Sequence, residues 1–332
     1  MRIPLRLSTP GVNFFAFACN RLDASVLRID QMRLKMRRLL AVATDNRHDI
    51  STLLFAIAGI AGLIGVHFHA VGWGDGFEMV KIAQNMVDHG TFGNPFGVLL
   101  TGPTAANPPA YPLLLAVFIK ILRQPSYVVL VALSGSILAN AATAAMLPYV
   151  SFRWFGDAIS GYIASVLWIG AMQPYPSWDT NYTVAGLLAF CLLTASDMEK
   201  SGSFVRRALI AGIVAGCVFL LNPSTALIML PWLLYLYLTK RKANSRSALK
   251  YCFVLLVAFS ILPFAWAARN YRQFGSFVIR TNLGMTLYVS NIDCAQSTLI
   301  KDESNNCYQE HHPNVENSSS VPKCDGKYST LS

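Results

Sequence analysis

Charged side chains are scarce in this sequence of 332 residues, where they make up only 13% of the total. Soluble globular domains carry about 25% charged residues, so the composition argues against a soluble protein. Acidic residues are the scarcer sign, because 17 Asp and Glu stand against 27 Lys and Arg. Hydrophobic residues account for 54% of the chain. We therefore predict an integral membrane protein.

The sequence also lacks the motifs that would identify several soluble functions. Its seven cysteines are scattered and form no CxxC pair, so no zinc or redox motif is recognisable. It has no aromatic RNA-binding signature, no isolated basic domain and no internal repeat. The net charge of +10 is therefore interpreted by the positive-inside rule, under which Lys and Arg accumulate in cytoplasmic loops. Nucleic acid is not expected as a partner.

Long apolar stretches dominate what is present, and seven of them are predicted to be membrane spans. They cover residues 50–66, 126–150, 157–173, 182–196, 207–221, 224–239 and 249–268. An eighth stretch, 108–122, is ambiguous because its uninterrupted apolar part is only about 14 residues, short of the ~20 needed to cross. It is either a true span or a helix that lies in the interface.

Charge distribution favours the interfacial interpretation of 108–122. If that segment does not cross, most of the 27 Lys and Arg lie on one side with the basic leader, 1–49. The predicted fold class is thus an all-α multi-span helical bundle of about seven spans, 50–268, with a cytoplasmic N-terminus. Its external loop, 67–125, carries juxtamembrane helices. The tail, 269–332, forms a small extracytoplasmic α/β cap that is incomplete, or is partly disordered.

The first external loop contains the acidic stretch "DGFEMVKIAQNMV". Its apolar spacing is that of an amphipathic helix, and Asp75 is placed to cap the start of that helix. Glu78 lies three residues on, where a capping box is the structural alternative. In a functional role, a carboxylate here would act as general base on an acceptor hydroxyl, or hold a divalent ion against a lipid-linked phosphate.

Further polar residues are candidates for substrate binding near the same surface. Lys81 is also placed to pair with Glu78 or to snorkel. Asn107 and Tyr111 belong to "ANPPAYPLLL", where prolines mark turns before an apolar helix. Asp179, in "SWDTNY", is favoured as the N-cap of the fourth span. Arg269 follows the last span on the external side, against the positive-inside trend, which gives weight to a phosphate partner.

The order of these features resembles a family of bacterial membrane glycosyltransferases. An acidic short helix is followed by "NPFG", "TGPTAANPPAYPLLLAVF", an "RWFG" turn, "WDTNYT", "LLNPS" and "PFAWAARNYRQFG". This series is similar to the GT-C fold in the dolichyl-phosphate-mannose-protein mannosyltransferase-like group, and more distantly to the aminoarabinose lipid A transferases. The resemblance covers roughly residues 53–314.

The resemblance implies a sugar donor linked to polyprenyl phosphate and an acceptor that is a lipid, a glycan or a protein. Transfer would take place outside the cytoplasm at the bacterial inner membrane, usually with inversion at the anomeric carbon. The family's catalytic acid maps to Glu78, with Asp75 as the neighbouring candidate, and Arg269 is the best match for the residue facing the lipid phosphate. No cofactor is assigned beyond a candidate divalent ion, Mg²⁺ or Mn²⁺, held by Asp75 and Glu78.

The sequence departs from that family in two places. The relatives usually carry a bulky residue where this chain has Ala106, and they continue through further spans beyond the position of Ser332. The chain is therefore expected to be a truncated member, and an inactive remnant is one alternative function. A secondary transporter is the other, although its usual marks are paired broken helices and intramembrane charge, and the predicted spans hold almost no ionisable residues and no visible inverted repeat.

Overall fold

The computed structural model describes residues 45–69, 78–95, 102–123, 128–171, 179–195, 204–242 and 244–281. The described residues are almost entirely helical, and their only β-type pairing is an isolated bridge between Gly93 and Pro103. The leader up to residue 44, Asp75, and the tail from residue 282, including the expected α/β cap, lie outside the described residues.

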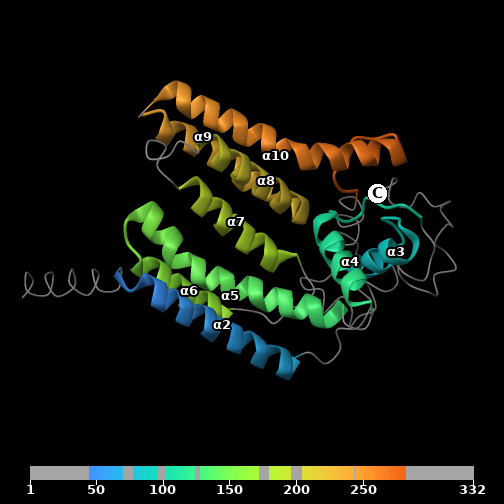
Figure 1. The fold of residues 1–332 in the computed structure, drawn as a ribbon, viewed down its shortest axis with the longest axis horizontal. Coiled ribbons are helices and arrows are strands. Elements are labelled where there is room, and N and C mark those ends of the chain that lie inside the picture. The colour runs from blue at the N-terminus through green and yellow to red at the C-terminus, as the bar shows by residue number, and fades with distance from the viewer. Residues whose placement is uncertain are drawn as a thin grey trace, which may run out of the picture.

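The helices follow the predicted apolar stretches closely (Figure 1). A helix occupies each of the seven predicted spans, and two further helices occupy the first loop. Their bounds are α2 Arg47–His69, α3 Glu78–His89, α4 Ala110–Leu122, α5 Val128–Phe155, α6 Ile159–Ala171, α7 Thr180–Thr194, α8 Phe204–Leu221, α9 Ala226–Lys240 and α10 Ser245–Phe274, with a 3-10 turn, η2, at Pro223–Thr225.

Length separates these helices into two groups. Four are long and apolar enough to cross a membrane, with spanning stretches at Arg47–His67, Leu130–Phe155, Phe204–Leu221 and Ser245–Phe274. The helices α6, α7 and α9 have 13, 15 and 15 residues. At 1.5 Å per residue they reach roughly 20–22 Å, less than the hydrocarbon thickness of about 30 Å. Four candidate spans are therefore established by length and composition, and the full set of seven stays a prediction.

The helices form two groups joined by α7 (Figure 1). On one side α5 packs against α2 and α6, on the other α8 packs against α10, and α7 contacts both α5 and α8. The short helices α3 and α4 pack together at one end of the bundle. We call this end, which carries Glu78, Asn107 and Arg280, the site end. The opposite end, where α5 finishes at Phe155 and α10 begins at Ser245, is the basic end.

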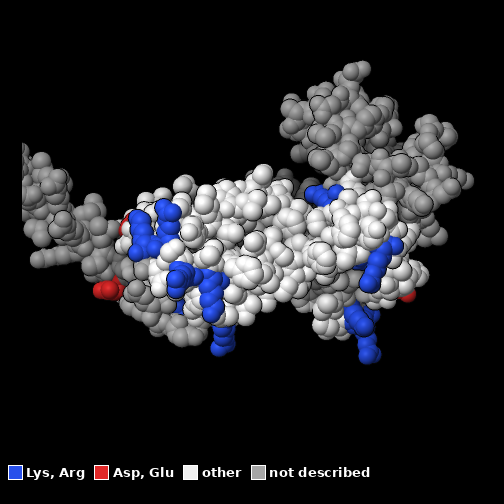
Figure 2. All heavy atoms as spheres, turned by 90° about the horizontal axis from the view of Figure 1, so that it is seen from above, with Lys and Arg blue, Asp and Glu red and all other residues white. Residues whose placement is uncertain are grey.

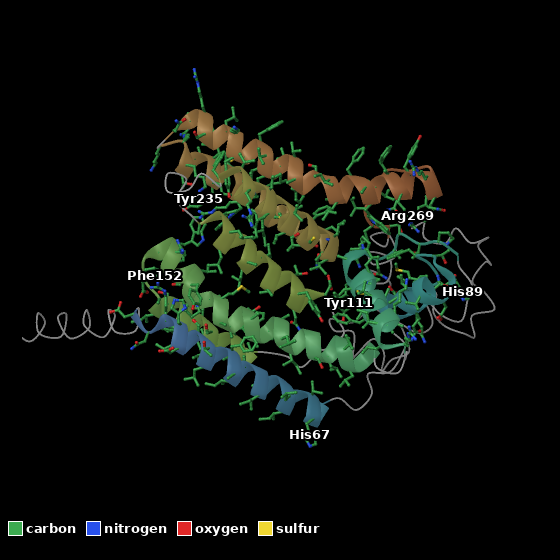
Figure 3. All side chains as sticks on the ribbon, viewed as in Figure 1. His67, His89, Tyr111, Phe152, Tyr235 and Arg269 are labelled. Carbon is green, nitrogen blue, oxygen red and sulfur yellow. The ribbon has the colours of Figure 1, made fainter. Side chains whose placement is uncertain are left out.

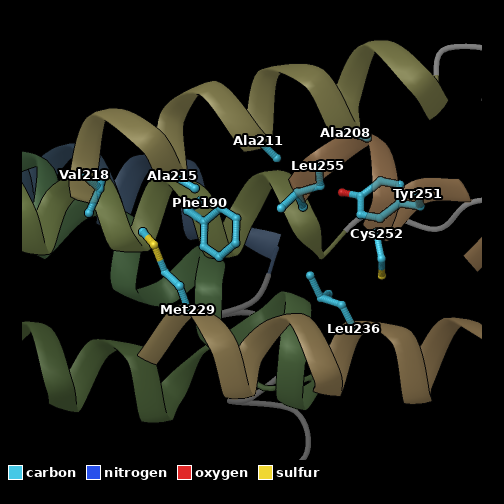
Figure 4. Close-up of a cluster of buried hydrophobic side chains, with 10 residues drawn as sticks. All are labelled: Phe190, Ala208, Ala211, Ala215, Val218, Met229, Leu236, Tyr251, Cys252 and Leu255. Atoms are coloured by element: carbon cyan, nitrogen blue, oxygen red, sulfur yellow. The ribbon is translucent and has the colours of Figure 1, made fainter. Parts of the chain in front are cut away.

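Close helix contacts depend on small residues. A Cβ added to Gly212 of α8 would lie 2.5 Å from the Leu255 carbonyl oxygen of α10, and one added to Gly216 would lie 2.9 Å from the Phe259 oxygen. Small residues spaced four apart allow helix backbones to approach in this way in membranes. The buried cluster beside this contact includes Phe190, Met229 and Leu236 (Figure 4).

The outer surface of the bundle is apolar. Large hydrophobic side chains point outward from the long helices, among them Leu63, Phe253 and Phe264, each more than 60% exposed. Figure 2 shows Lys and Arg near both ends of one face and none over its middle. An extended apolar surface of this kind suits lipid rather than water as its surroundings. The structure thus supports an integral membrane protein.

Candidate functional site

The site end contains a carboxylate held by an amide. Glu78 is the first residue of α3, and the Nδ2 of Asn107 donates a 2.7 Å hydrogen bond to its Oε2. Asn107 is only 2% exposed, and Pro108 and Pro109 immediately precede α4. These prolines restrict the backbone next to Asn107, and the amide therefore has a defined direction toward Glu78.

Burial sets the protonation behaviour of Glu78. Loss of water around the carboxyl raises its pKa above the usual value, because the charged form is disfavoured in an apolar environment. The hydrogen bond from Asn107 and the positive charge of Arg280 oppose this effect. Glu78 is therefore a carboxylate whose basicity is increased by burial while two groups still favour its ionised form.

Asp179 lies at the N-cap position of α7, where the sequence placed it, but it does not cap the helix. Its side chain makes no capping hydrogen bond, and its backbone dihedrals, φ −62° and ψ −18°, are already helical. A capping residue normally has extended backbone angles that direct its side chain to the first amides. The prediction that the Asp179 side chain caps α7 is therefore wrong, although Asp179 does occupy the N-cap position.

The Asp179 side chain is instead buried near other site groups. It is 5% exposed, burial raises its pKa, and Arg280 lowers it by direct electrostatic attraction. The Tyr111 hydroxyl is also within electrostatic range of Asp179. Two carboxylates from separate elements, Glu78 and Asp179, are thus within electrostatic range of one cation, Arg280.

Arg280 is that cation, and the sequence analysis did not select it. Its Nε donates to the Ala106 carbonyl at 3.1 Å, and both Glu78 and Asp179 act on its charge. Burial lowers the pKa of its guanidinium while the two carboxylates raise it. The same segment is fixed by α10, because Trp266 Nε1 donates to the Ile279 oxygen at 2.9 Å and Asn270 Nδ2 to the Val278 oxygen at 2.7 Å.

Arg269, the expected phosphate ligand, has a different set of partners. Its NH1 donates to the Thr104 oxygen at 2.8 Å and to Asn270 Oδ1 at 2.9 Å, and its NH2 donates to the Phe92 oxygen at 3.0 Å. Its guanidinium also lies over the rings of Phe92, Trp266 and Phe274. Arg269 therefore binds the loop backbone to α10, and its donors NH1 and NH2 are already engaged by protein groups.

The other polar residues considered in the sequence lie on α3 and α4. Tyr111 is 1% exposed, its ring lies 5.4 Å from that of Tyr182, and its hydroxyl finds no hydrogen-bond partner within the described part of the chain. Lys81 is half-buried on α3. Asp88 and His89 at the end of α3 are exposed. Figure 3 places Tyr111 and Arg269 at the site end with α3 and α4.

The expected metal site was tested against the arrangement of His, Cys, Asp and Glu side chains in the described part of the chain. Among them, no three His, Cys, Asp or Glu side chains gather in a way that could hold an ion. Glu78 and Asp179 have the oxygen chemistry that Mg²⁺ or Mn²⁺ prefers, but the positive charge of Arg280 acts on both of them. Asp75, the other expected ligand, lies outside the described residues.

An apolar cavity of about 380 Å³ lies among α8, α9 and α10. Its lining is almost wholly hydrocarbon and includes Phe219, Met229, Phe259, Phe264 and Ile279. Ile279 directly precedes Arg280, so the cavity and the charged group share one short segment of chain. A ligand with a charged head and a long apolar chain has the chemistry to occupy both.

Comparisons with protein-family models, with curated proteins and with solved structures find no match for this chain. The class that the fold and the site define is a helical integral membrane protein with carboxylate, carboxamide and guanidinium side chains gathered at one end.

Proposed function

We propose that the protein is a membrane glycosyltransferase, which moves a sugar from a polyprenyl-phosphate donor to an acceptor hydroxyl. One observation carries the proposal: the apolar cavity is lined by Ile279, the residue before Arg280, and the Arg280 charge is within electrostatic range of Glu78 and Asp179. A polyprenyl phosphate has a matching division into a long hydrocarbon chain and an anionic head. The resemblance to GT-C glycosyltransferases supports the same reaction class.

Arg280 has the chemistry required for the donor phosphate. Guanidinium groups bind phosphate oxygens through paired, charge-assisted hydrogen bonds. Only the Nε of Arg280 is committed to the Ala106 carbonyl by a hydrogen bond described above. In the proposed complex its terminal nitrogens bind the phosphate, and the isoprenoid chain occupies the cavity among α8, α9 and α10.

Glu78 acts as the general base in this proposal. The acceptor O–H transfers its proton to the Glu78 carboxylate as the acceptor oxygen bonds to the anomeric carbon. The bond between that carbon and the phosphate oxygen breaks, and its electron pair leaves with polyprenyl phosphate. Arg280 stabilises the charge that builds on the departing phosphate. Attack from the face opposite the leaving group inverts the anomeric configuration.

Asn107 positions the Glu78 carboxylate, and Asp179 balances the positive charge of Arg280. Asn107 directs the Glu78 carboxylate through its 2.7 Å hydrogen bond. Asp179 adds a second negative charge that holds Arg280 when no phosphate is bound. We place the reaction on the external side of a bacterial inner membrane, because the leader and most of the cations belong to the opposite, cytoplasmic side.

The experiment measures transfer by the full chain in lipid nanodiscs. A panel of polyprenyl-phosphate hexoses and pentoses is supplied, and release or transfer of the sugar is followed by mass spectrometry. Glu78→Gln is expected to lose about 10²–10⁴-fold in rate, the range for loss of a general base. Asp88→Asn removes an exposed carboxylate from the same helix and is the matched control. Equal rates for Glu78→Gln and the parent would disprove the assigned role.

Binding distinguishes the proposal from its alternatives. The parent should bind polyprenyl phosphate more tightly than the uncharged polyprenol, and Arg280→Met should remove that preference while Arg272→Met retains it. Binding without transfer of any sugar in the panel would indicate an inactive remnant. Solute uptake into proteoliposomes without sugar transfer would indicate a secondary transporter.

A further inference from the structure

The basic end has an uneven distribution of charge. Residues 204–281 contain no Asp or Glu. Seven Lys and Arg from this segment gather where α8 begins, α9 ends and α10 begins: Arg206, Arg207, Lys240, Arg241, Lys242, Arg246 and Lys250. We call these seven residues the cationic patch. Figure 2 shows Lys and Arg grouped at this end of the face that carries α10.

The neighbouring helices at the same end have mixed charge. There, Asp49 lies in the first turn of α2, Asp157 precedes α6, and Arg153 lies in the last turn of α5. The cationic patch is thus a property of the α8, α9 and α10 group rather than of the whole end. The segment 196–203, with Asp197 and Glu199, lies outside the described residues.

Most of the cationic patch is exposed. Arg206, Arg241, Lys242, Arg246 and Lys250 are exposed, whereas Arg207 and Lys240 are partly buried. Lys240 Nζ lies 5.1 Å from the centre of the Tyr251 ring, and the Arg241 guanidinium lies 5.9 Å from that of Tyr237. Two of the cations therefore border aromatic side chains, and most of the patch is accessible at the surface.

Aromatic residues mark the level of the membrane interface at this end. Trp154, Trp232 and Tyr235 form a cluster in which the two Trp ring centres lie 4.7 Å apart, and Phe204 packs 5.5 Å from Tyr251. Figure 3 places Tyr235 and Phe152 at this end. Trp and Tyr concentrate at the headgroup level of membrane proteins. The cationic patch adjoins this level, at the ends of helices whose sides are apolar.

We propose that the cationic patch binds the anionic headgroups of phospholipids in the adjoining leaflet. Negative lipid phosphates complement the charge of the cationic patch, because residues 204–281 contain no Asp or Glu. The first turns of α8 and α10 add the partial positive charge of two helix N-termini. This interaction lies at the opposite end from the Glu78 site and does not depend on the proposed sugar transfer.

The test measures which lipids the full chain retains. The protein is placed in nanodiscs of equal phosphatidylcholine and phosphatidylglycerol, and co-purified lipids are counted by native mass spectrometry. The parent should retain phosphatidylglycerol in excess of its share of the bilayer. The triple variant Lys242→Gln/Arg246→Gln/Lys250→Gln should lose about fivefold in this preference per cation removed.

A matched variant and a salt series complete the design. Lys120→Gln/Arg123→Gln/Arg272→Gln removes three exposed cations from the site end and should keep the parent's preference. Raising NaCl from about 50 mM to about 500 mM should reduce the preference of the unaltered protein, because exposed charges are screened. Retention of the two lipids in the bilayer ratio by the parent would overturn the proposal. Equal losses in the two triple variants would also overturn it.

Discussion

Asn107 and Glu78, 29 positions apart in the sequence, are joined by a 2.7 Å hydrogen bond between amide and carboxylate. The bond favours the ionised form of Glu78, whose burial favours the protonated form. Asn107→Ala should therefore raise the pKa of Glu78. In the proposed reaction the base would become ionised only at higher pH, so the acidic limb of the kcat/KM profile should move to higher pH.

The control for this prediction is Thr104→Ala, in the same buried loop. The Thr104 hydroxyl accepts a 3.0 Å bond from the Ala106 amide, and the Glu78 carboxylate is held by Asn107 instead. Its variant should retain the position of the acidic limb, whatever it does to stability. An unchanged profile in Asn107→Ala would mean that the 2.7 Å bond does not influence the reacting base.

Arg269 and Arg280 should respond differently to the same substitution. Arg269→Gln removes donors to the Thr104 and Phe92 carbonyls, which would be left without their charged partner. Hydrogen bonds to charged groups contribute about 1.5–3 kcal/mol each, so the melting temperature in detergent should fall markedly. Arg280→Gln removes one bond to the Ala106 carbonyl and should cost less stability.

Phosphate binding provides the second measurement on this pair. Arg280→Gln should weaken binding of polyprenyl phosphate, with polyprenol as the uncharged reference. Arg269→Lys keeps the charge but loses the planar arrangement of donors, and so should destabilise the protein. Weaker phosphate binding in Arg269→Lys, together with unchanged binding in Arg280→Gln, would return the phosphate contact to Arg269.

Asp157 is the capping residue that Asp179 is not. Its carboxylate accepts bonds from the Ile159 amide at 2.9 Å and the Ser160 amide at 3.2 Å, which lower its pKa. A lowered folded-state pKa means that the stabilisation is present above the unfolded pKa, which for Asp is about 3.9, and is lost as pH falls through the folded value. Asp157→Ala should cost about 1 kcal/mol at neutral pH.

Asp179→Ala is the comparison for this prediction. Asp179 has a raised pKa, so its ionisation opposes folding as pH rises, and it makes no capping bond to be lost. Its variant should be as stable as the parent or more stable at neutral pH. Thermal unfolding in detergent at neutral and acidic pH measures both variants. A larger loss from Asp179→Ala than from Asp157→Ala would contradict the assignment.

The sequence predicted the helices better than their relation to the membrane. Uninterrupted apolar runs produced α2, α5, α8 and α10 close to their expected positions, because composition and length suffice to specify a long apolar helix. The shorter helices α6, α7 and α9 occupy predicted spans but have only 13–15 residues. Apolar composition alone does not determine whether such a helix crosses.

The site shows where sequence reasoning reached its limit. Glu78 was selected from its setting, whereas Arg280 was not, because its relation to Glu78 depends on folding of the chain after α10 against the loop. Arg269 and Arg280 both follow the apolar part of the last span. Both guanidinium groups donate to backbone carbonyls of residues 92 and 104–106, and Arg280 is also within electrostatic range of Glu78 and Asp179. Sequence position does not contain that information.

The contact between α8 and α10 yields a final prediction. Gly212 leaves no space for a side chain, because an added Cβ would lie 2.5 Å from the Leu255 oxygen and 2.6 Å from the Ala258 Cβ. Gly212→Ala should therefore separate the two helices at a cost of about 1–3 kcal/mol, the range for overpacking. It should also disturb the apolar cavity, which Leu255 and Ala215 line.

Gly59→Ala on α2 is the matched control, since nothing lies within 4 Å of an added Cβ there. That variant should be neutral or gain up to about 1 kcal/mol from helix propensity. Thermal unfolding in detergent, with polyprenyl phosphate binding as a second readout, tests the pair. Equal stability of the two variants would show that the close approach of α8 and α10 is not required by the fold.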